Sequence, residues 1–108
     1  MRPYEVMVIY DAELDQADIR SAVERSTQLL ESRGAEIGPV DHWGKRPFAY
    51  RLKRRWEGYY VVLQARAEPD AMSELGRTLT LADEVLRHKV LRIPESVYGK
   101  TLGTPAGE

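Results

Sequence analysis

The chain has 108 residues, no cysteine and a formal net charge of -1, with 43% hydrophobic and 31% charged residues. This composition indicates one globular domain, and the lack of cysteine excludes disulfides, thiolate metal sites and cysteine nucleophiles. No apolar run approaches the ~20 residues of a membrane span. Residues Met1 to Glu5 lack the apolar core of a signal peptide, so we expect a cytoplasmic protein.

The charges are unevenly distributed along the chain. Residues 1–40 carry 4 basic and 8 acidic side chains, whereas residues 41–66 carry 7 basic and 2 acidic ones. Residues 67–86 are again acidic, with 1 basic and 5 acidic side chains. This segregation favours binding of a polyanion on one surface, although two independently solvated segments would give the same pattern.

The first half of the chain predicts a strand, a helix and a second strand. Residues 4–10 are β-branched and aromatic, which is typical of a central strand. Asp15 suits the N-cap of a helix over residues 16–33, and Gly34 suits a left-handed stop after it. Glycine and proline then interrupt the pattern, and an edge strand is predicted over at least residues 47–53.

The second half predicts a strand, a helix and a last strand. After a loop over residues 54–58, residues 59–66 form the most apolar strand, with odd-numbered side chains facing the helices and even-numbered ones facing away. Pro69 suits the first turn of a helix that ends near residue 81. Residues 85–93 predict an edge strand, and residues 94–108 a flexible tail outside the domain of residues 1–93.

The order strand, helix, strand, strand, helix, strand predicts an α+β fold. It is the order of the ferredoxin-like split βαβ sandwich, a four-stranded antiparallel sheet with two helices on one face. Right-handed crossovers would place the first and third strands in the centre of the sheet. The other face of the sheet would be open to solvent or to a partner.

No constellation of residues indicates catalysis or metal binding. His42 and His88 lie in separate segments, without a second ligand at helical spacing. The step Gly44-Lys45-Arg46 lacks the additional glycine and the hydroxyl of a phosphate-binding loop. We therefore expect neither a cofactor nor an enzyme activity.

Basic and aromatic residues are interleaved around the second strand. The cations are Lys45, Arg46, Arg51, Lys53, Arg54 and Arg55, and the aromatic residues are Trp43, Phe48, Tyr50 and Trp56. Guanidinium groups bind phosphates in a forked geometry, and aromatic rings stack on unpaired bases, so this set favours RNA binding. The alternative is that the rings form hairpin core while the cations protect an edge strand.

A second basic group is predicted at the border between the first and last strands. Arg2 and Tyr4 begin the first strand, and Arg87, Lys89 and Arg92 belong to the last. If these strands are neighbours, we expect the cations to lie side by side. The border would flank an open face bearing Met7, Ile9, Tyr60, Val62 and Leu91, and such apolar patches usually contact protein partners. A register error of one residue would reverse this assignment.

Several short motifs, taken together, resemble the bacterial small-subunit ribosomal protein six family. They are Met1-Arg2-Pro3-Tyr4-Glu5, Trp43-Gly44-Lys45-Arg46, Phe48-Ala49-Tyr50, Glu57-Gly58-Tyr59-Tyr60 and Val85-Leu86-Arg87-His88 followed by Val90-Leu91-Arg92. They occur in order over about residues 1–93.

The resemblance implies a non-enzymatic component of the small ribosomal subunit in the cytoplasm. Such proteins bind the central domain of the small-subunit ribosomal RNA as a pair with small-subunit protein eighteen. By position, RNA contacts are expected at Arg2, Tyr4, Arg87 and Arg92, and the basic hairpin adds Lys53 and Arg54. The protein partner is expected at Trp43, Arg46, Phe48 and Tyr50.

Two other functions have the same predicted order of elements. An RNA-recognition motif would bind single-stranded RNA without a partner protein, but it requires stacking rings where this chain has Met7, Val8 and Val61 or Val62. A small dimeric α+β monooxygenase would require a cavity of roughly 300 Å³ between sheet and helices.

Overall fold

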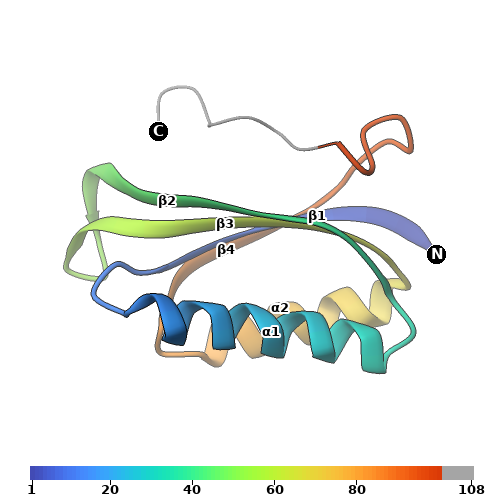
Figure 1. Ribbon diagram of the computed structural model, residues 1–108, viewed down its shortest axis with the longest axis horizontal. Helices are drawn as coiled ribbons and strands as arrows, with labels where there is room; N and C mark the ends of the chain where they lie inside the picture. Colours follow the sequence, from blue (N-terminus) through green and yellow to red (C-terminus); the bar gives the residue numbers. More distant parts are fainter. Residues whose placement is uncertain (101–108) are drawn as a thin grey trace.

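The structure, a computed structural model, is described here for residues 1–100 and forms a sheet with two helices on one face (Figure 1). In chain order the elements are β1 (Arg2–Asp11), α1 (Gln16–Ser32), β2 (Glu36–Leu52), β3 (Arg55–Ala67), α2 (Pro69–Leu81) and β4 (Val85–Arg92). The strand order is β2-β3-β1-β4 and every neighbouring pair is antiparallel. The predicted ferredoxin-like fold is confirmed, with β1 and β3 in the centre.

The helix ends follow the predicted capping residues. Asp15 Oδ1 accepts a hydrogen bond of 2.8 Å from the backbone N–H of Asp18, which satisfies one of the free donors in the first turn of α1. Gly34 lies beyond the end of α1 with φ at +83°, a conformation that glycine adopts without steric cost. Pro69 begins α2, where its missing N–H removes no helical hydrogen bond.

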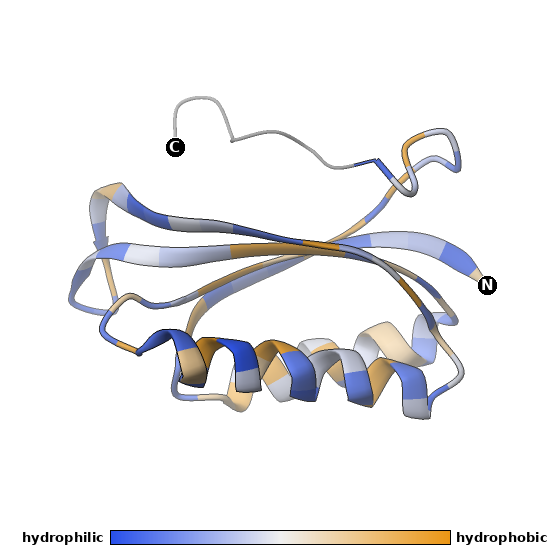
Figure 2. Ribbon diagram, viewed as in Figure 1, coloured by the Kyte–Doolittle hydropathy of each residue, from blue (hydrophilic) through white to orange (hydrophobic). Residues whose placement is uncertain are grey.

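The core lies between the sheet and the helices. Even-numbered residues of β1 and odd-numbered residues of β3 face the helices, because side chains alternate between the two faces of a strand. Fully buried members of this core include Val6, Val8, Val61, Leu63, Ile19, Leu30 and Leu75. In Figure 2 the central strands are hydrophobic along their middle stretches, consistent with burial on both faces.

The face of the sheet that the helices do not cover, here called the open face, carries a second apolar cluster. Ile9, Tyr60 and Leu86 are buried in it, and Met7, Trp43 and Phe48 pack against them. The predicted alternation of β3 is therefore confirmed.

The second strand extends well before the minimum range of residues 47–53 that was predicted, and it ends at Leu52. β2 begins at Glu36, and its pairing with β3 shifts register between Ile37 and Val40 and again between His42 and Gly44. Bulges of this kind absorb the glycine and proline residues that would interrupt a regular strand. The predicted loop over residues 54–58 is also wrong, because β3 begins at Arg55 and only Lys53 and Arg54 form the turn, with φ at 48° and 67°.

Residues 94–100, predicted to belong to a flexible tail, lie against the open face. After β4 the chain turns back on the side of the sheet opposite the helices (Figure 1). Hydrogen bonds within the segment, such as Val97 N–H to Pro94 O at 3.0 Å, form successive turns, and Gly99 N–H donates to Gln64 Oε1 at 2.8 Å. The prediction missed these contacts because the segment has few apolar residues. The rest of the predicted tail, residues 101–108, lies outside the described residues.

Candidate functional site

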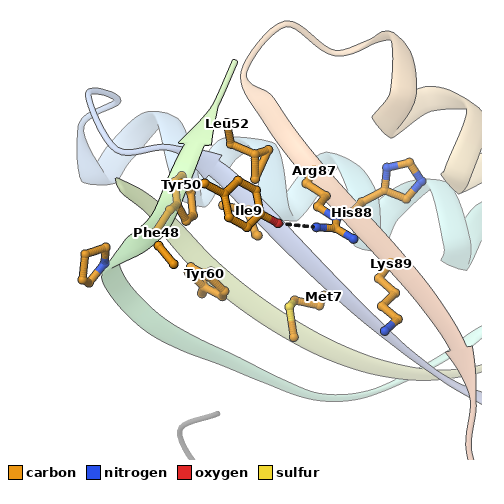
Figure 3. Close-up of a pocket in the computed structure, with 11 residues that line it drawn as sticks. Met7, Ile9, Phe48, Tyr50, Leu52, Tyr60, Arg87, His88 and Lys89 are labelled. Carbon is orange, nitrogen blue, oxygen red and sulfur yellow. Dashed lines mark hydrogen bonds between the residues drawn. The ribbon is translucent and has the colours of Figure 1, made fainter. Parts of the chain in front are cut away.

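The open face contains a groove of about 290 Å³ near the turn between β2 and β3 (Figure 3). Its apolar surface comes from three strands, with Met7, Ile9, Phe48, Leu52 and Tyr60. Arg87 and Lys89 of β4 supply its cationic side, and no aspartate or glutamate lines it among residues 1–100. The groove therefore combines apolar surface with positive charge and suits a partner that offers both an apolar and an anionic group.

The end of the β2–β3 hairpin forms one wall of the groove. The Nζ of Lys53 donates to the carbonyl of Val85 at 3.2 Å, and Arg87 Nη1 donates to the Tyr50 hydroxyl at 3.4 Å. Figure 3 shows the Tyr50 ring extending over Ile9 toward Arg87. These contacts join the end of β2 to the beginning of β4, although the two strands are at opposite edges of the sheet.

The residues predicted to contact a protein partner gather on the open face. The Trp43 ring stacks on Tyr60 at 6.4 Å between centroids and 14° between planes, and Phe48 lies 6.3 Å from the same ring. Tyr50 is 60% exposed, so most of its ring is available. Arg46 is half-buried, and its Nη1 donates to the Lys45 carbonyl at 3.3 Å. The structure therefore brings these rings together beside the groove.

The cations predicted to contact RNA do not form a single border. They fall into two groups at opposite ends of the sheet. Arg87 lies opposite Ile9, whereas Arg92 lies opposite Tyr4, five residues further along both strands. Five residues of extended strand span about 16 Å, and an odd separation places the two side chains on opposite faces. Lys53 and Arg54 belong to the Arg87 end, and Arg2 belongs to the Arg92 end.

The expectation that Tyr4 offers a surface for RNA is wrong. Its side chain is 7% exposed and belongs to the core between sheet and helices, because the even-numbered residues of β1 face that core. Tyr4 lies between Ala65 and Arg92 in the sheet. It supports the end of the sheet at which Arg2 and Arg92 are exposed.

Two further residues line the groove: Lys89, which was predicted as part of the basic border, and Leu52, which was not predicted. Lys89 lies opposite Met7 on the open face and is exposed, and Leu52 closes the groove near the turn. The alternation of β4 contained the signal for Lys89, since it shares a face with Arg87. The position of Leu52 depends on the bend of the hairpin, which no local pattern indicated.

Arg55, part of the predicted basic set, is neutralised by acidic residues. Its guanidinium lies 3.1 Å from Asp11, the last residue of β1, and 2.9 Å from Glu13, which follows β1. These ion pairs fix the beginning of β3 against the end of β1. Arg55 is therefore a structural cation, and the exposed cations of the turn are Lys53 and Arg54.

The other properties of the described residues give no sign of an enzyme site. A crevice of about 260 Å³ opens between the helices near Tyr10 and Ser26, but neither His88 nor Trp43 lines it. Within residues 1–100 no group of three or more metal-ligating side chains occurs. None of the helices in the same residues is long and apolar enough to cross a membrane.

Comparison with known proteins identifies the family. Residues 3–92 match the family model described as ribosomal protein S6. The chain belongs to the ribosomal protein S6 family. It is therefore a protein of the small ribosomal subunit, located in the cytoplasmic ribosome, and the family is structural rather than enzymatic. The monooxygenase alternative is thus wrong, and the resemblance drawn from the motifs is confirmed.

Individual S6 proteins are similar over most of their length. The small ribosomal subunit protein bS6 of Carboxydothermus hydrogenoformans is 45% identical over 92 residues, covering 85% of this chain and 96% of the relative. That of Mycobacterium tuberculosis is 44% identical with the same coverage. The crystal structure of 30S ribosomal protein S6 from Thermotoga maritima superimposes with a TM-score of 0.81 at 30% identity, covering 85% of this chain and 87% of that one.

Proposed function

We propose that this S6 protein binds the central domain of the small-subunit ribosomal RNA together with small-subunit protein eighteen. The observation that carries the proposal is the groove, which joins an apolar surface to exposed cations on the one face of the sheet that the helices leave free. A protein that only bound RNA would not need the apolar part, and one that only bound protein would not need so many cations.

The protein partner is assigned to the groove and the rings beside it. Trp43, Phe48 and Tyr50 supply apolar area around Tyr60, and aromatic residues of this kind dominate the binding energy of protein interfaces. Arg46 borders the same surface, on the strand position opposite Gly58. Protein eighteen would therefore cover the open face at its β2 side.

The RNA is assigned to the two exposed basic groups. Lys53, Arg54 and Arg87 form one group at the turn, and Arg2 and Arg92 form the other at the far end of the sheet. Exposed cations about 16 Å apart suit phosphates on separate turns or separate strands of a folded RNA better than adjacent phosphates of one strand.

The experiment is a mobility-shift titration of a central-domain RNA fragment with this protein, with and without protein eighteen, at several salt concentrations. We expect tight binding only when both proteins are present. Arg87→Ala should weaken binding and reduce the salt slope by about one. Arg20→Ala, which removes an exposed arginine from α1 in the helix layer, is the matched control.

The protein contact is tested separately by titrating protein eighteen alone. Tyr50→Ala should weaken this contact without lowering the free energy of unfolding by more than about 0.5 kcal/mol, because the ring is mostly exposed. Leu81→Ala, at a 72% exposed apolar residue of α2, is the control. Equal affinities for wild type and Tyr50→Ala would remove the groove from the partner interface, and equal RNA binding by Arg87→Ala would remove Arg87 from the RNA interface.

A further inference from the structure

Residues 94–100, here called the strap, are held on the open face by a buried side-chain amide. Gln64 is 2% exposed, and its Oε1 accepts from Gly99 N–H at 2.8 Å while its Nε2 donates to the Lys100 carbonyl at 2.9 Å. The same Nε2 lies 3.2 Å from Glu5 Oε1, which is also buried. The side chain of this one glutamine therefore hydrogen-bonds to the backbone of the strap, as a neighbouring strand would.

The strap also fills a notch in β2. An added Cβ at Gly38 would lie 2.9 Å from the Tyr98 hydroxyl oxygen, so the phenol occupies the space that a side chain at this position would need. The Tyr98 hydroxyl lies 3.5 Å from the Glu36 carbonyl oxygen. The missing side chain of Gly38, within the first bulge of β2, thus provides a seat for the strap.

Arg66 is the residue whose charged side chain makes specific contacts with side chains of the strap. Its Nη2 donates to Glu95 Oε1 at 2.7 Å, and its guanidinium carbon lies 4.5 Å from the centroid of the Tyr98 ring. Its Nε is buried and has no hydrogen-bond partner among the described residues. The strap therefore offers Arg66 an aromatic ring and one anionic oxygen, and leaves one donor of the guanidinium unused.

An unpaired nucleotide offers the same two groups, a flat ring and an anion. Arginine stacks on bases and binds phosphate through two parallel N–H donors, which would use both Nε and Nη2. We propose that the strap is an autoinhibitory segment that occupies, within the same chain, a binding position for an unpaired ribonucleotide at Arg66. With the strap in place, the part of the open face around Arg66, where β3 pairs with Pro3 of β1 and Glu36 of β2, is closed to single-stranded RNA.

The proposal is tested with the isolated full-length chain and a fluorescein-labelled oligouridine at low salt, followed by fluorescence anisotropy. The double variant Glu95→Gln/Tyr98→Ala removes the anion and the ring, and Gly38→Val closes the notch. Hydrogen exchange at the Gly99 amide reports whether the strap has left the sheet. We expect faster exchange and about tenfold tighter oligouridine binding in both, in line with stacking of a single base.

Two further variants make the result specific. Adding Arg66→Ala to Glu95→Gln/Tyr98→Ala should return the affinity to that of wild type. Glu31→Gln, at an exposed residue of α1, controls for the lost negative charge and should leave the affinity unchanged.

The proposal would be overturned by an unprotected Gly99 amide in wild type, or by a strap that stays bound in both releasing variants. It would also be overturned by strap release without tighter binding, or by a gain that survives Arg66→Ala. Since no partner protein and no folded RNA are present, failure here would leave the proposed function unaffected.

Discussion

Gly58 and Ile9 lie so close together on the open face that no Cβ fits between them. An added Cβ at Gly58 would collide with Ile9 Cγ2 and would lie 2.8 Å from Phe48 Cζ. This close approach of β3 to β1 and β2 lets the end of the hairpin bend over the sheet and form the wall of the groove. The glycine is required for space, and its φ is not in the left-handed region.

We expect Gly58→Ala to lower the free energy of unfolding by about 1–3 kcal/mol, as overpacking does. Urea denaturation measures the change. Gly76→Ala is the control of opposite sign, because the nearest atom to its Cβ is His88 Nε2 at 3.7 Å and alanine is favoured in a helix by about 1 kcal/mol. A Gly58→Ala protein as stable as wild type would contradict the close contact.

Tyr10 makes stability depend on pH in the alkaline range. Burial raises the pKa of its hydroxyl to about 12, more than the hydrogen bond to Ser26 lowers it. Above pH 10 the unfolded chain loses this proton while the folded chain keeps it, so stability falls as pH rises from 10 to 12. A shift of this size corresponds to about 3 kcal/mol.

Chemical denaturation at about pH 9, 10, 11 and 12 checks this dependence, because the range includes the pKa of Tyr10 in both the unfolded and the folded chain. We expect the difference in unfolding free energy between wild type and Tyr10→Phe to change by about 2 kcal/mol between pH 9 and pH 12, because the phenylalanine has no proton to lose and the folded tyrosine is itself half-ionised at about pH 12. A constant difference would mean that the Tyr10 hydroxyl is not buried in the folded protein.

Tyr4 should affect stability but not RNA binding. Its ring is buried in the core, so Tyr4→Phe should leave the affinity for the central-domain RNA within about twofold, whereas Tyr4→Ala should cost about 3–5 kcal/mol of stability. Mobility shifts and urea denaturation of both variants give the two numbers. A large loss of RNA affinity in a stably folded Tyr4→Phe protein would show that the hydroxyl reaches the RNA.

Arg87 and Arg92 should act independently. They are separated by about 16 Å of strand and point to opposite faces, and substitutions this far apart add to within about 0.5 kcal/mol. The double variant Arg87→Ala/Arg92→Ala should therefore lose the sum of the two single losses in RNA-binding free energy. A double variant no weaker than the worse single variant would indicate one shared phosphate and contradict the two-group arrangement.

The sequence was informative where one physical signal dominated. Apolar β1 and β3, the Asp15 cap and the Gly34 stop were predicted because hydrophobic alternation and capping are local. The sequence predicted only a minimum extent for β2, at least residues 47–53, because the glycines and proline before it coincide with bulges, which depend on the neighbouring strand. The strap was missed because Gln64 binds its backbone, and a backbone contact leaves no pattern in side chains.

The candidate site was predicted in composition but not in arrangement. The rings of Trp43, Phe48 and Tyr50 do gather on the open face. Strict alternation would put Trp43 and Phe48 on opposite faces, and the register shift between His42 and Gly44 is what brings them to the same one. The cations do not form the single border expected, because residue spacing along β4 determines both distance and face. The position of Tyr4 in the core follows from the same alternation of side chains. It was predicted to contact RNA instead because it lies next to Arg2 in the sequence motif.

The turn between β2 and β3 places two charged side chains where the backbone would favour others. Lys53 and Arg54 both have positive φ, which costs a residue other than glycine or asparagine roughly 1–2 kcal/mol. Asn-Gly at these positions would lower the conformational strain of the turn and would also remove its two positive charges. Selection for a more stable hairpin and selection for contacts with anions therefore oppose each other at these two positions. In a thermostable descendant of this chain, we expect the affinity of this turn for anions to be lost first.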